Sequence, residues 1–129
     1  MHRDLKPENI MVNLRPLRAT LIDFDISMLR DATTTTSNRG TPGYYPQRPT
    51  MKDGNTAWDV WAMAAVILEA DMRPGEFLGM ATERNAHLKA EEHMKEKETS
   101  VALRVMLTHT LLRGEVSSME GMSFIRKQL

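Results

Sequence analysis

Two short groups of side chains capable of chemistry stand within the first 25 residues of the chain. Carboxylates accept protons from reacting groups and bind hard cations such as magnesium, and a lysine ammonium acts as a point charge that neutralises anionic groups. The 129 residues contain no cysteine, which excludes a thiolate zinc site and a cysteine nucleophile. Residues of the useful types stand together in His2-Arg3-Asp4-Leu5-Lys6-Pro7-Glu8-Asn9 and again in Asp23-Phe24-Asp25.

Four segments resemble, in order, the landmarks of the eukaryotic protein kinase family. HRDLKPEN at 2–9 resembles the family's catalytic loop, H-R-D-L-x-x-x-N, and DFD at 23–25 stands where the family has its DFG motif. GTPGY at 40–44 resembles the end of an activation segment, and DVW at 59–61 resembles the start of the family's central buried helix. Four ordered motifs are far harder to obtain by chance than one. Lys6 and Thr41 resemble the serine/threonine branch of the family rather than the tyrosine branch.

The resemblance implies ATP-dependent phosphoryl transfer to serine or threonine of a protein, with ATP and Mg²⁺ as cofactors. In the family's roles, Asp4 accepts the proton of the substrate hydroxyl, and Lys6 contacts and stabilises the transferring phosphoryl group. Asn9 and Asp23 hold magnesium through an amide oxygen and a carboxylate. Met11 matches the residue beneath the adenine ring, and a plain position in the apolar core is the alternative for this methionine.

Three matched positions have architectural roles in the family. The carboxylate of Asp59 corresponds to one that accepts backbone N–H groups from the catalytic loop. That role explains an acidic residue at the start of an otherwise apolar segment. His2 and Phe24 match the lower part of the family's regulatory spine.

The resemblance also implies a set of regulatory residues. Arg3 precedes the aspartate, as in kinases that dock an activation-segment phosphate on this arginine. By distance from Thr41, Ser37 falls closest to the usual phosphorylation site and Thr36 is next. A phosphate there would form charge-assisted hydrogen bonds to Arg3 and order the loop. A polar loop without such a role remains the alternative.

The elements that must position these residues are predicted from apolar patterning. Runs at 10–12 and 19–22 predict a β-hairpin with a longer loop over 13–18. A long surface loop is predicted over 27–56. A buried helix, apolar on nearly every face, is predicted over 58–68, with Thr56 as its candidate N-cap and Pro74-Gly75 as its end. The charged stretch 81–98 predicts a solvated helix, 101–112 an apolar helix, and 117–129 a last helix. The expected fold class is mainly α with a short β-hairpin, a partial protein-kinase-like C-terminal lobe.

The sequence also departs from the family. None of its seven glycines forms G-x-G, and no lysine ends a V-A-I-K-like segment. Asp25 replaces the DFG glycine, and Gln47 replaces the glutamate of the family's APE motif. We therefore expect one truncated kinase domain over 1–129 with its N-terminal lobe absent, weak or no ATP binding by the chain alone, and little or no activity. The competing class is a non-catalytic, pseudokinase-like interaction module.

Charge and composition limit the expected partners. The 17 basic and 17 acidic residues give a net charge of +0, which provides no electrostatic footprint for nucleic acid or an anionic membrane. The first residues are charged where a signal peptide is apolar, and no apolar run approaches the roughly 18 residues of a membrane span. We expect an intracellular chain, cytoplasmic or nuclear. Its expected partners are a protein substrate, an upper-lobe-like or scaffolding protein, or a second copy, because one flank of the central helix would be left open.

Overall fold

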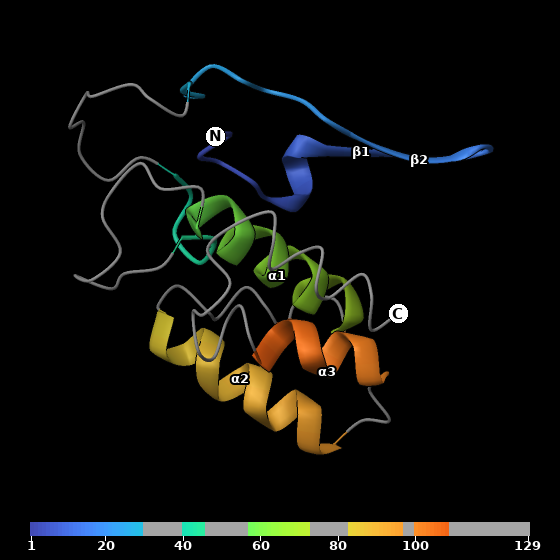
Figure 1. Ribbon diagram of the computed structural model, residues 1–129, viewed down its shortest axis with the longest axis vertical. Helices are drawn as coiled ribbons and strands as arrows, with labels where there is room; N and C mark the ends of the chain where they lie inside the picture. The colour runs from blue at the N-terminus through green and yellow to red at the C-terminus, as the bar shows by residue number, and fades with distance from the viewer. Residues whose placement is uncertain (30–39, 46–56, 73–82, 97–99, 109–129) are drawn as a thin grey trace.

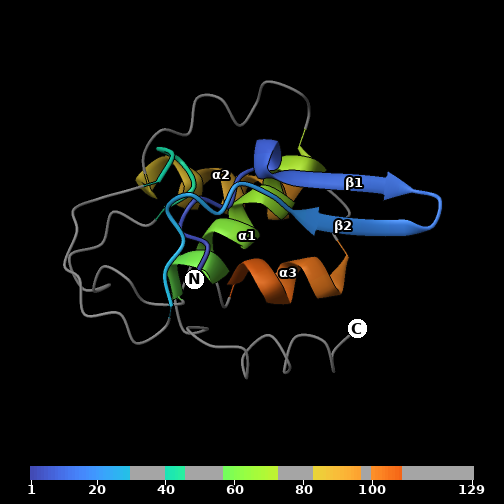
Figure 2. The same cartoon turned by 90° about the horizontal axis from the view of Figure 1, so that it is seen from above.

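The structure is a computed structural model that describes residues 1–29, 40–45, 57–72, 83–96 and 100–108. Helix α1 lies between a two-stranded sheet on one side and helices α2 and α3 on the other (Figure 1). Seen from above, the sheet extends beyond the helices (Figure 2). In chain order the elements are a 3-10 helix at Pro7–Asn9, β1 at Ile10–Leu14, β2 at Leu17–Leu21, α1 at Ala57–Asp71, α2 at Glu83–Glu96 and α3 at Val101–Leu107.

The predicted β-hairpin is confirmed, but its loop is shorter than expected. Strands β1 and β2 pair antiparallel from Ile10 opposite Leu21 to Leu14 opposite Leu17. Only two residues connect them, because the polar residues expected in the loop continue the ladder. The side-chain oxygen of Asn13 accepts the backbone N–H of Arg15 at 2.9 Å, which supplies the local hydrogen bond of a tight turn.

The core lies where the three helices meet. Helix α1 is rich in alanine, a strong helix former whose small side chain lets neighbouring helices approach closely. Most faces of α1 are buried, as predicted, and the exposed Ile67 and Ala70 agree with the expectation that one flank of this helix is left open. The buried cluster consists of Trp61, Ala64, Ala65, Leu68, Ala90 and Leu107.

Helix α2 has the solvated face expected from its charged residues, and it also has a buried face that the sequence analysis did not specify. Glu91 and Lys95 are exposed, whereas Ala90 and His93 are buried. The Nε2 atom of His93 lies 2.6 Å from the carboxylate oxygen of Asp71 at the end of α1. A buried polar group requires such a partner, so this contact ties α2 to α1.

Several predicted features lie outside the described residues. These are the candidate phosphorylation sites Ser37 and Thr36, the Thr56 cap, the Pro74-Gly75 helix end, Gln47 and the last helix predicted over 117–129. Within the ranges that the structure describes, no helix has the length and apolar character needed to cross a bilayer.

Candidate active site

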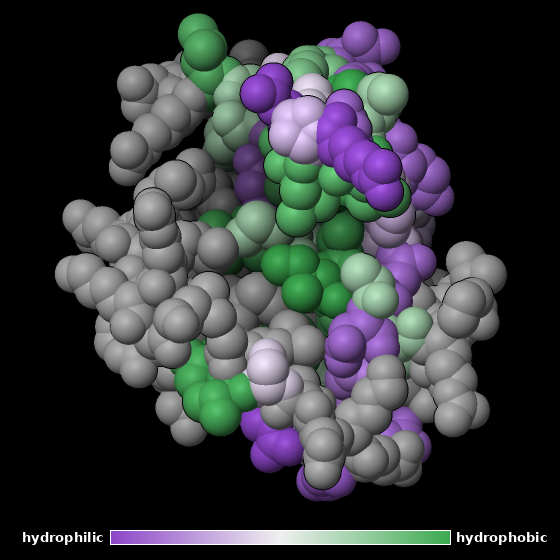
Figure 3. Space-filling model, turned by 90° about the vertical axis from the view of Figure 1, so that its right-hand side faces the viewer, coloured by the Kyte–Doolittle hydropathy of each residue, from purple (hydrophilic) through white to green (hydrophobic). Residues whose placement is uncertain are grey.

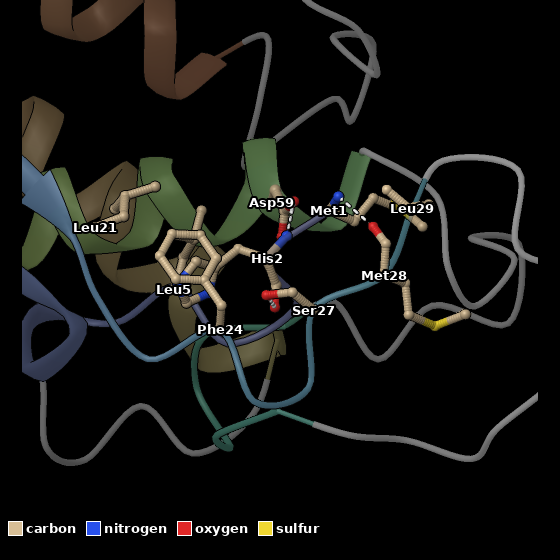
Figure 4. Close-up of a pocket in the computed structure, with 9 residues that line it drawn as sticks. All are labelled: Met1, His2, Leu5, Leu21, Phe24, Ser27, Met28, Leu29 and Asp59. Carbon is tan, nitrogen blue, oxygen red and sulfur yellow. Dashed lines mark hydrogen bonds between the residues drawn. The ribbon is translucent and has the colours of Figure 1, made fainter.

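The segment from His2 to Asn9, called here the N-terminal loop, is anchored to the start of α1 by Asp59. One carboxylate oxygen accepts the backbone N–H of His2 at 2.7 Å, and the other accepts that of Arg3 at 2.8 Å. The first of these bonds is visible in Figure 4. Arg3 has a φ of 72°, a left-handed conformation that costs free energy in a residue other than glycine. The paired bonds from Asp59 therefore hold the loop in a backbone shape that it would not adopt by itself.

His2 joins the N-terminal loop to the chain that follows β2. Its Nε2 atom lies 2.9 Å from the carbonyl oxygen of Ile22, and this nitrogen carries the proton because a carbonyl can only accept. The His2 ring contacts the ring of Phe24 with a centroid distance of 4.8 Å. The Ser27 hydroxyl donates to the His2 carbonyl at 3.2 Å. The two residues matched to the regulatory spine therefore touch, and the segment containing Asp23 is held beside the loop.

Asp4 is the centre of a network of four side chains. One carboxylate oxygen accepts the backbone N–H of Thr41 at 2.9 Å and its hydroxyl at 2.8 Å. The other lies 3.0 Å from the Lys6 ammonium and 3.3 Å from the Asn9 amide nitrogen. Lys6 also donates to the Thr41 hydroxyl at 2.9 Å. The structure thus brings Asp4, Lys6 and Asn9 together with a threonine 37 residues away from Asp4.

A glycine allows the Thr41 segment to approach the loop this closely. Gly40 has a φ of 139°, and a Cβ atom placed there would lie 3.1 Å from the backbone oxygen of Arg3. Any other residue would face both an unfavourable backbone conformation and a close contact with main-chain atoms. The glycine before Thr41 is therefore required by the geometry of the network.

The environment of Asp4 favours its ionised form. Partial burial raises the pKa of Asp4, but the hydrogen bonds from Thr41 and Lys6, together with the Lys6 charge, outweigh this effect and leave the pKa below its ordinary value. Asp4 is consequently a carboxylate at neutral pH, which is the form that can accept a proton.

Replacing Thr41 by valine is expected to raise the pKa of Asp4, because the hydroxyl bond is lost while the shape of the side chain is kept. The stabilisation from this bond is present above a pH of about 4, the unfolded pKa of aspartate, and is lost as the pH falls through the lower folded pKa. Titration of the Asp4 carboxyl carbon by NMR measures the change. Thr41→Ser retains the hydroxyl and serves as the control. If the pKa of Asp4 were the same in the valine and serine variants, the hydrogen bond from the Thr41 hydroxyl to Asp4 would be contradicted.

Asn9 and Asp23 provide oxygen atoms of the kind that magnesium prefers. The side-chain amide nitrogen of the buried Asn9 donates to the backbone oxygen of Asp4 at 2.9 Å, which orients the side-chain amide. The backbone carbonyl of Asn9 accepts the backbone N–H of Ile22 at 3.0 Å. Because Ile22 precedes Asp23, this backbone bond holds the chain at the exposed Asp23 near the N-terminal loop. Among the described residues, no three histidine or acidic side chains converge to hold a metal ion. The match of Asn9 and Asp23 to magnesium ligands therefore remains a prediction, in which phosphate and water would supply the other ligands.

Met11 lies on β1 with its side chain 61% exposed. The alternative of a plain core methionine is therefore wrong. In the ladder it pairs with Thr20, on the face of the hairpin that also carries Asn13 and Arg18. Its match to the adenine-contacting position remains a prediction.

The described part of the chain contains Arg3 but neither candidate phosphorylation site. The Arg3 guanidinium donates to the Met28 sulfur at 2.6 Å. Docking of a phosphate on this arginine remains a prediction, since Ser37 and Thr36 lie outside the described residues.

A hydrogen bond between Tyr44 and Glu69 was not anticipated from the sequence. The Tyr44 hydroxyl donates to the Glu69 carboxylate at 2.5 Å. Burial raises the pKa of Tyr44 above its ordinary value, and the Glu69 hydrogen bond and the charges of Glu69 and Glu8 raise it further. The available signal was an acidic residue late in the apolar stretch of α1. This bond attaches the segment carrying Thr41 to the central helix.

Tyr44→Phe is expected to destabilise the fold by about 1–3 kcal/mol, because a partly buried hydrogen bond to a carboxylate is lost. Its folded pKa is raised, so the stabilisation is present below a pH of about 10 and is lost as the pH rises through the folded value. Urea unfolding at several pH values measures the effect. The control is Tyr45→Phe, which keeps the ring stacked on Trp58 at 5.8 Å. Equal destabilisation by both variants would argue against a special role of the Tyr44 bond.

Comparison with known proteins places the chain in a family. It is 29% identical over 128 residues to the serine/threonine-protein kinase nekl-2 of Caenorhabditis elegans, covering 92% of this chain and 36% of that protein. It is 32% identical over 93 residues to a protein of Arabidopsis thaliana named as a leucine-rich repeat receptor-like serine/threonine-protein kinase, covering 68% of this chain and 10% of that one. The chain thus spans about a third and a tenth of the lengths of these relatives, and no solved structure matches it. A family model described as the protein kinase domain matches residues 1–129, so the chain belongs to the protein kinase domain family.

Proposed function

We propose that the chain forms most of the C-terminal lobe of a serine/threonine protein kinase and carries its catalytic loop. Completed by an upper lobe, it would transfer the γ-phosphoryl group of ATP to serine or threonine of a protein. The observation that supports this most strongly is the position of Asp4, an ionised carboxylate held by Thr41, Lys6 and Asn9. Folding alone does not require Asp4, Lys6, Asn9 and Asp23 together, so their joint presence favours an enzyme over a scaffold.

The proposed reaction uses these side chains for positioning and charge. The substrate hydroxyl oxygen attacks the γ-phosphorus, the bond to the bridging oxygen of ADP breaks, and the hydroxyl proton passes to Asp4. The oxygen of Asp4 that faces Lys6 and Asn9 is the better acceptor, because its contacts of 3.0 and 3.3 Å are longer than the 2.8 and 2.9 Å bonds from Thr41 to the other oxygen. The Lys6 ammonium neutralises charge on the phosphoryl group. Magnesium, when bound at Asn9 and Asp23, neutralises further phosphate charge.

The 129 residues alone are expected to bind Mg-ATP weakly or not at all. Their sequence contains no G-x-G and no V-A-I-K-like segment whose lysine could hold the α- and β-phosphates. Titrating Mg-ATP while recording thermal unfolding should raise the melting temperature only marginally. A clear response at micromolar ATP would show that the chain holds nucleotide without those elements.

A non-catalytic binding role is the second candidate, and the exposed apolar hairpin favours it. One substitution separates the two functions. In a fusion of 1–129 behind the upper lobe of a serine/threonine kinase, Asp4→Asn should abolish transfer to a peptide substrate if the chain is catalytic. In a binding module the same change would leave partner binding intact, and neither version of the fusion would show transfer.

A further inference from the structure

The Arg3 guanidinium lies against the thioether of Met28. One of its N–H groups donates to the Met28 sulfur at 2.6 Å, and both residues are half-buried. A thioether sulfur is a weak hydrogen-bond acceptor, whereas a guanidinium is a permanently charged donor. The Met28 sulfur is therefore held beside a donor that would bond more strongly to an oxygen atom in the same place.

Backbone contacts fix both residues of this pair. The Asp59 carboxylate accepts the backbone N–H of Arg3 at 2.8 Å. The backbone N–H of Met28 donates to the Met1 carbonyl at 2.9 Å, and the Met28 carbonyl accepts the Met1 nitrogen at 2.8 Å. The Met28 side chain points away from Phe24 in Figure 4. The main chain therefore sets the position of the Met28 sulfur beside Arg3.

Hydrogen peroxide oxidises a thioether to a sulfoxide, and Arg3 is placed to assist this reaction at Met28. The sulfur lone pair attacks one peroxide oxygen, so that a sulfur–oxygen bond forms as the oxygen–oxygen bond breaks. The second oxygen leaves as hydroxide and takes the proton from the oxygen now bound to sulfur, which gives the sulfoxide and water. The sulfur loses two electrons and the peroxide gains them. The guanidinium stabilises the negative charge that develops on the peroxide oxygens.

The product of this reaction finds a hydrogen-bond partner at the site. Oxidation of a methionine in an apolar core disrupts packing, because a polar oxygen is buried there without a partner. Met28 is only half-buried and faces a charged donor, so its sulfoxide oxygen would form a charge-assisted hydrogen bond to Arg3. We propose that Met28 is a site of oxidation by peroxide and that Arg3 binds the resulting sulfoxide.

Two other methionines provide internal references for the oxidation of Met28. Met28, Met94 and Met11 are each the only methionine of a tryptic peptide, at 19–30, 90–95 and 4–18. Met94 is half-buried like Met28 and packs against the buried core cluster, and no described residue donates a hydrogen bond to its sulfur. Met11 is 61% exposed on the hairpin, which projects toward the viewer at the top of Figure 3. Met94 is thus the matched control, and Met11 reports the dose of oxidant.

Brief exposure of the 129-residue chain to hydrogen peroxide, followed by digestion and mass spectrometry, measures the oxidation rate of each methionine. Met28 should be oxidised about fivefold faster than Met94, which is the rate effect of roughly one net hydrogen bond in the transition state. Arg3→Gln is shorter and uncharged, so it should remove this advantage and leave the Met94 rate unchanged. Arg3→Lys keeps the charge and should give an intermediate rate. Circular dichroism shows whether each variant is folded.

Two substitutions at Met28 test the bond to Arg3 without an oxidant. Met28→Gln supplies an amide oxygen in place of the sulfoxide oxygen, whereas Met28→Leu supplies no acceptor. Met28→Gln should melt about 3 °C higher than Met28→Leu, and the difference should disappear when Arg3→Gln is added. Equal oxidation rates of Met28 and Met94, a Met28 rate that folded Arg3→Gln leaves unchanged, or a melting temperature of Met28→Gln no higher than that of Met28→Leu would each overturn the proposal. The comparison of the two Met28 variants decides the question even if Arg3→Gln fails to fold.

Discussion

Asp4→Asn is expected to lower the rate of phosphoryl transfer by about a thousandfold when 1–129 is fused behind the upper lobe of a serine/threonine kinase. An amide cannot take up the hydroxyl proton, and general-base catalysis contributes roughly 10²–10⁴ to an enzymatic rate. The amide oxygen can still accept the Thr41 bonds, whereas the amide nitrogen would face the Lys6 and Asn9 donors, so the charge pairing with Lys6 is lost and the rates are compared for folded fusions. Initial rates of ³²P transfer from ATP to a peptide measure the effect.

The matched control for Asp4→Asn is Glu91→Gln, which makes the same carboxylate-to-amide change on the exposed face of α2. Its rate should equal that of the unsubstituted fusion. A folded Asp4→Asn fusion that retained more than a tenth of the rate would exclude Asp4 as the proton acceptor.

Asp59→Ala is expected to cost about 3–6 kcal/mol of stability in the 129-residue chain. Two backbone N–H groups lose a charged acceptor, and each such bond contributes about 1.5–3 kcal/mol. The left-handed conformation at Arg3 also loses the contact that holds it. Small domains have about 5–15 kcal/mol in total, so the variant should unfold at much lower urea concentration.

Two substitutions calibrate the Asp59→Ala result. Asp59→Asn keeps one acceptor oxygen but presents an amide nitrogen to the second N–H group, so its loss of stability should be intermediate. Asp25→Ala removes an exposed carboxylate and should have little effect. If Asp59→Ala unfolded at the same urea concentration as Asp25→Ala, the proposed anchoring of the loop would be wrong.

Features encoded by neighbouring residues could be predicted from the sequence. The two apolar runs at 10–12 and 19–22 predicted the hairpin, and the apolar run at 58–68 predicted α1. The loop length was predicted wrongly because Asn13 and Arg18 are polar residues that nevertheless pair in the ladder. Helix α2, whose sequence is highly charged, has a buried face, because His93 on that face pairs with the acidic Asp71 of α1.

Contacts between distant residues could not be predicted from the sequence. The kinase resemblance identified Asp4, Lys6 and Thr41 separately, but the Thr41 hydroxyl joins the other two across 37 and 35 residues of sequence, which no local pattern specifies. The bond from Tyr44 to Glu69 depends on the same placement. Composition alone could not show that Val12, Leu14 and Leu17 lie on one face of the hairpin, because only the register of the strands shows which residues share a face.

The identity of the phosphorylated residue tests the central claim most directly. The fusion of 1–129 behind an upper lobe would be supplied with Mg-ATP and peptides that each carry one serine, threonine or tyrosine, and mass spectrometry would locate the phosphate. We predict phosphate on serine or threonine, lost when Asp4 is replaced by asparagine. Phosphate on tyrosine alone, or equal phosphorylation by the folded Asp4→Asn fusion, would contradict the proposal that this chain carries the catalytic loop of a serine/threonine kinase.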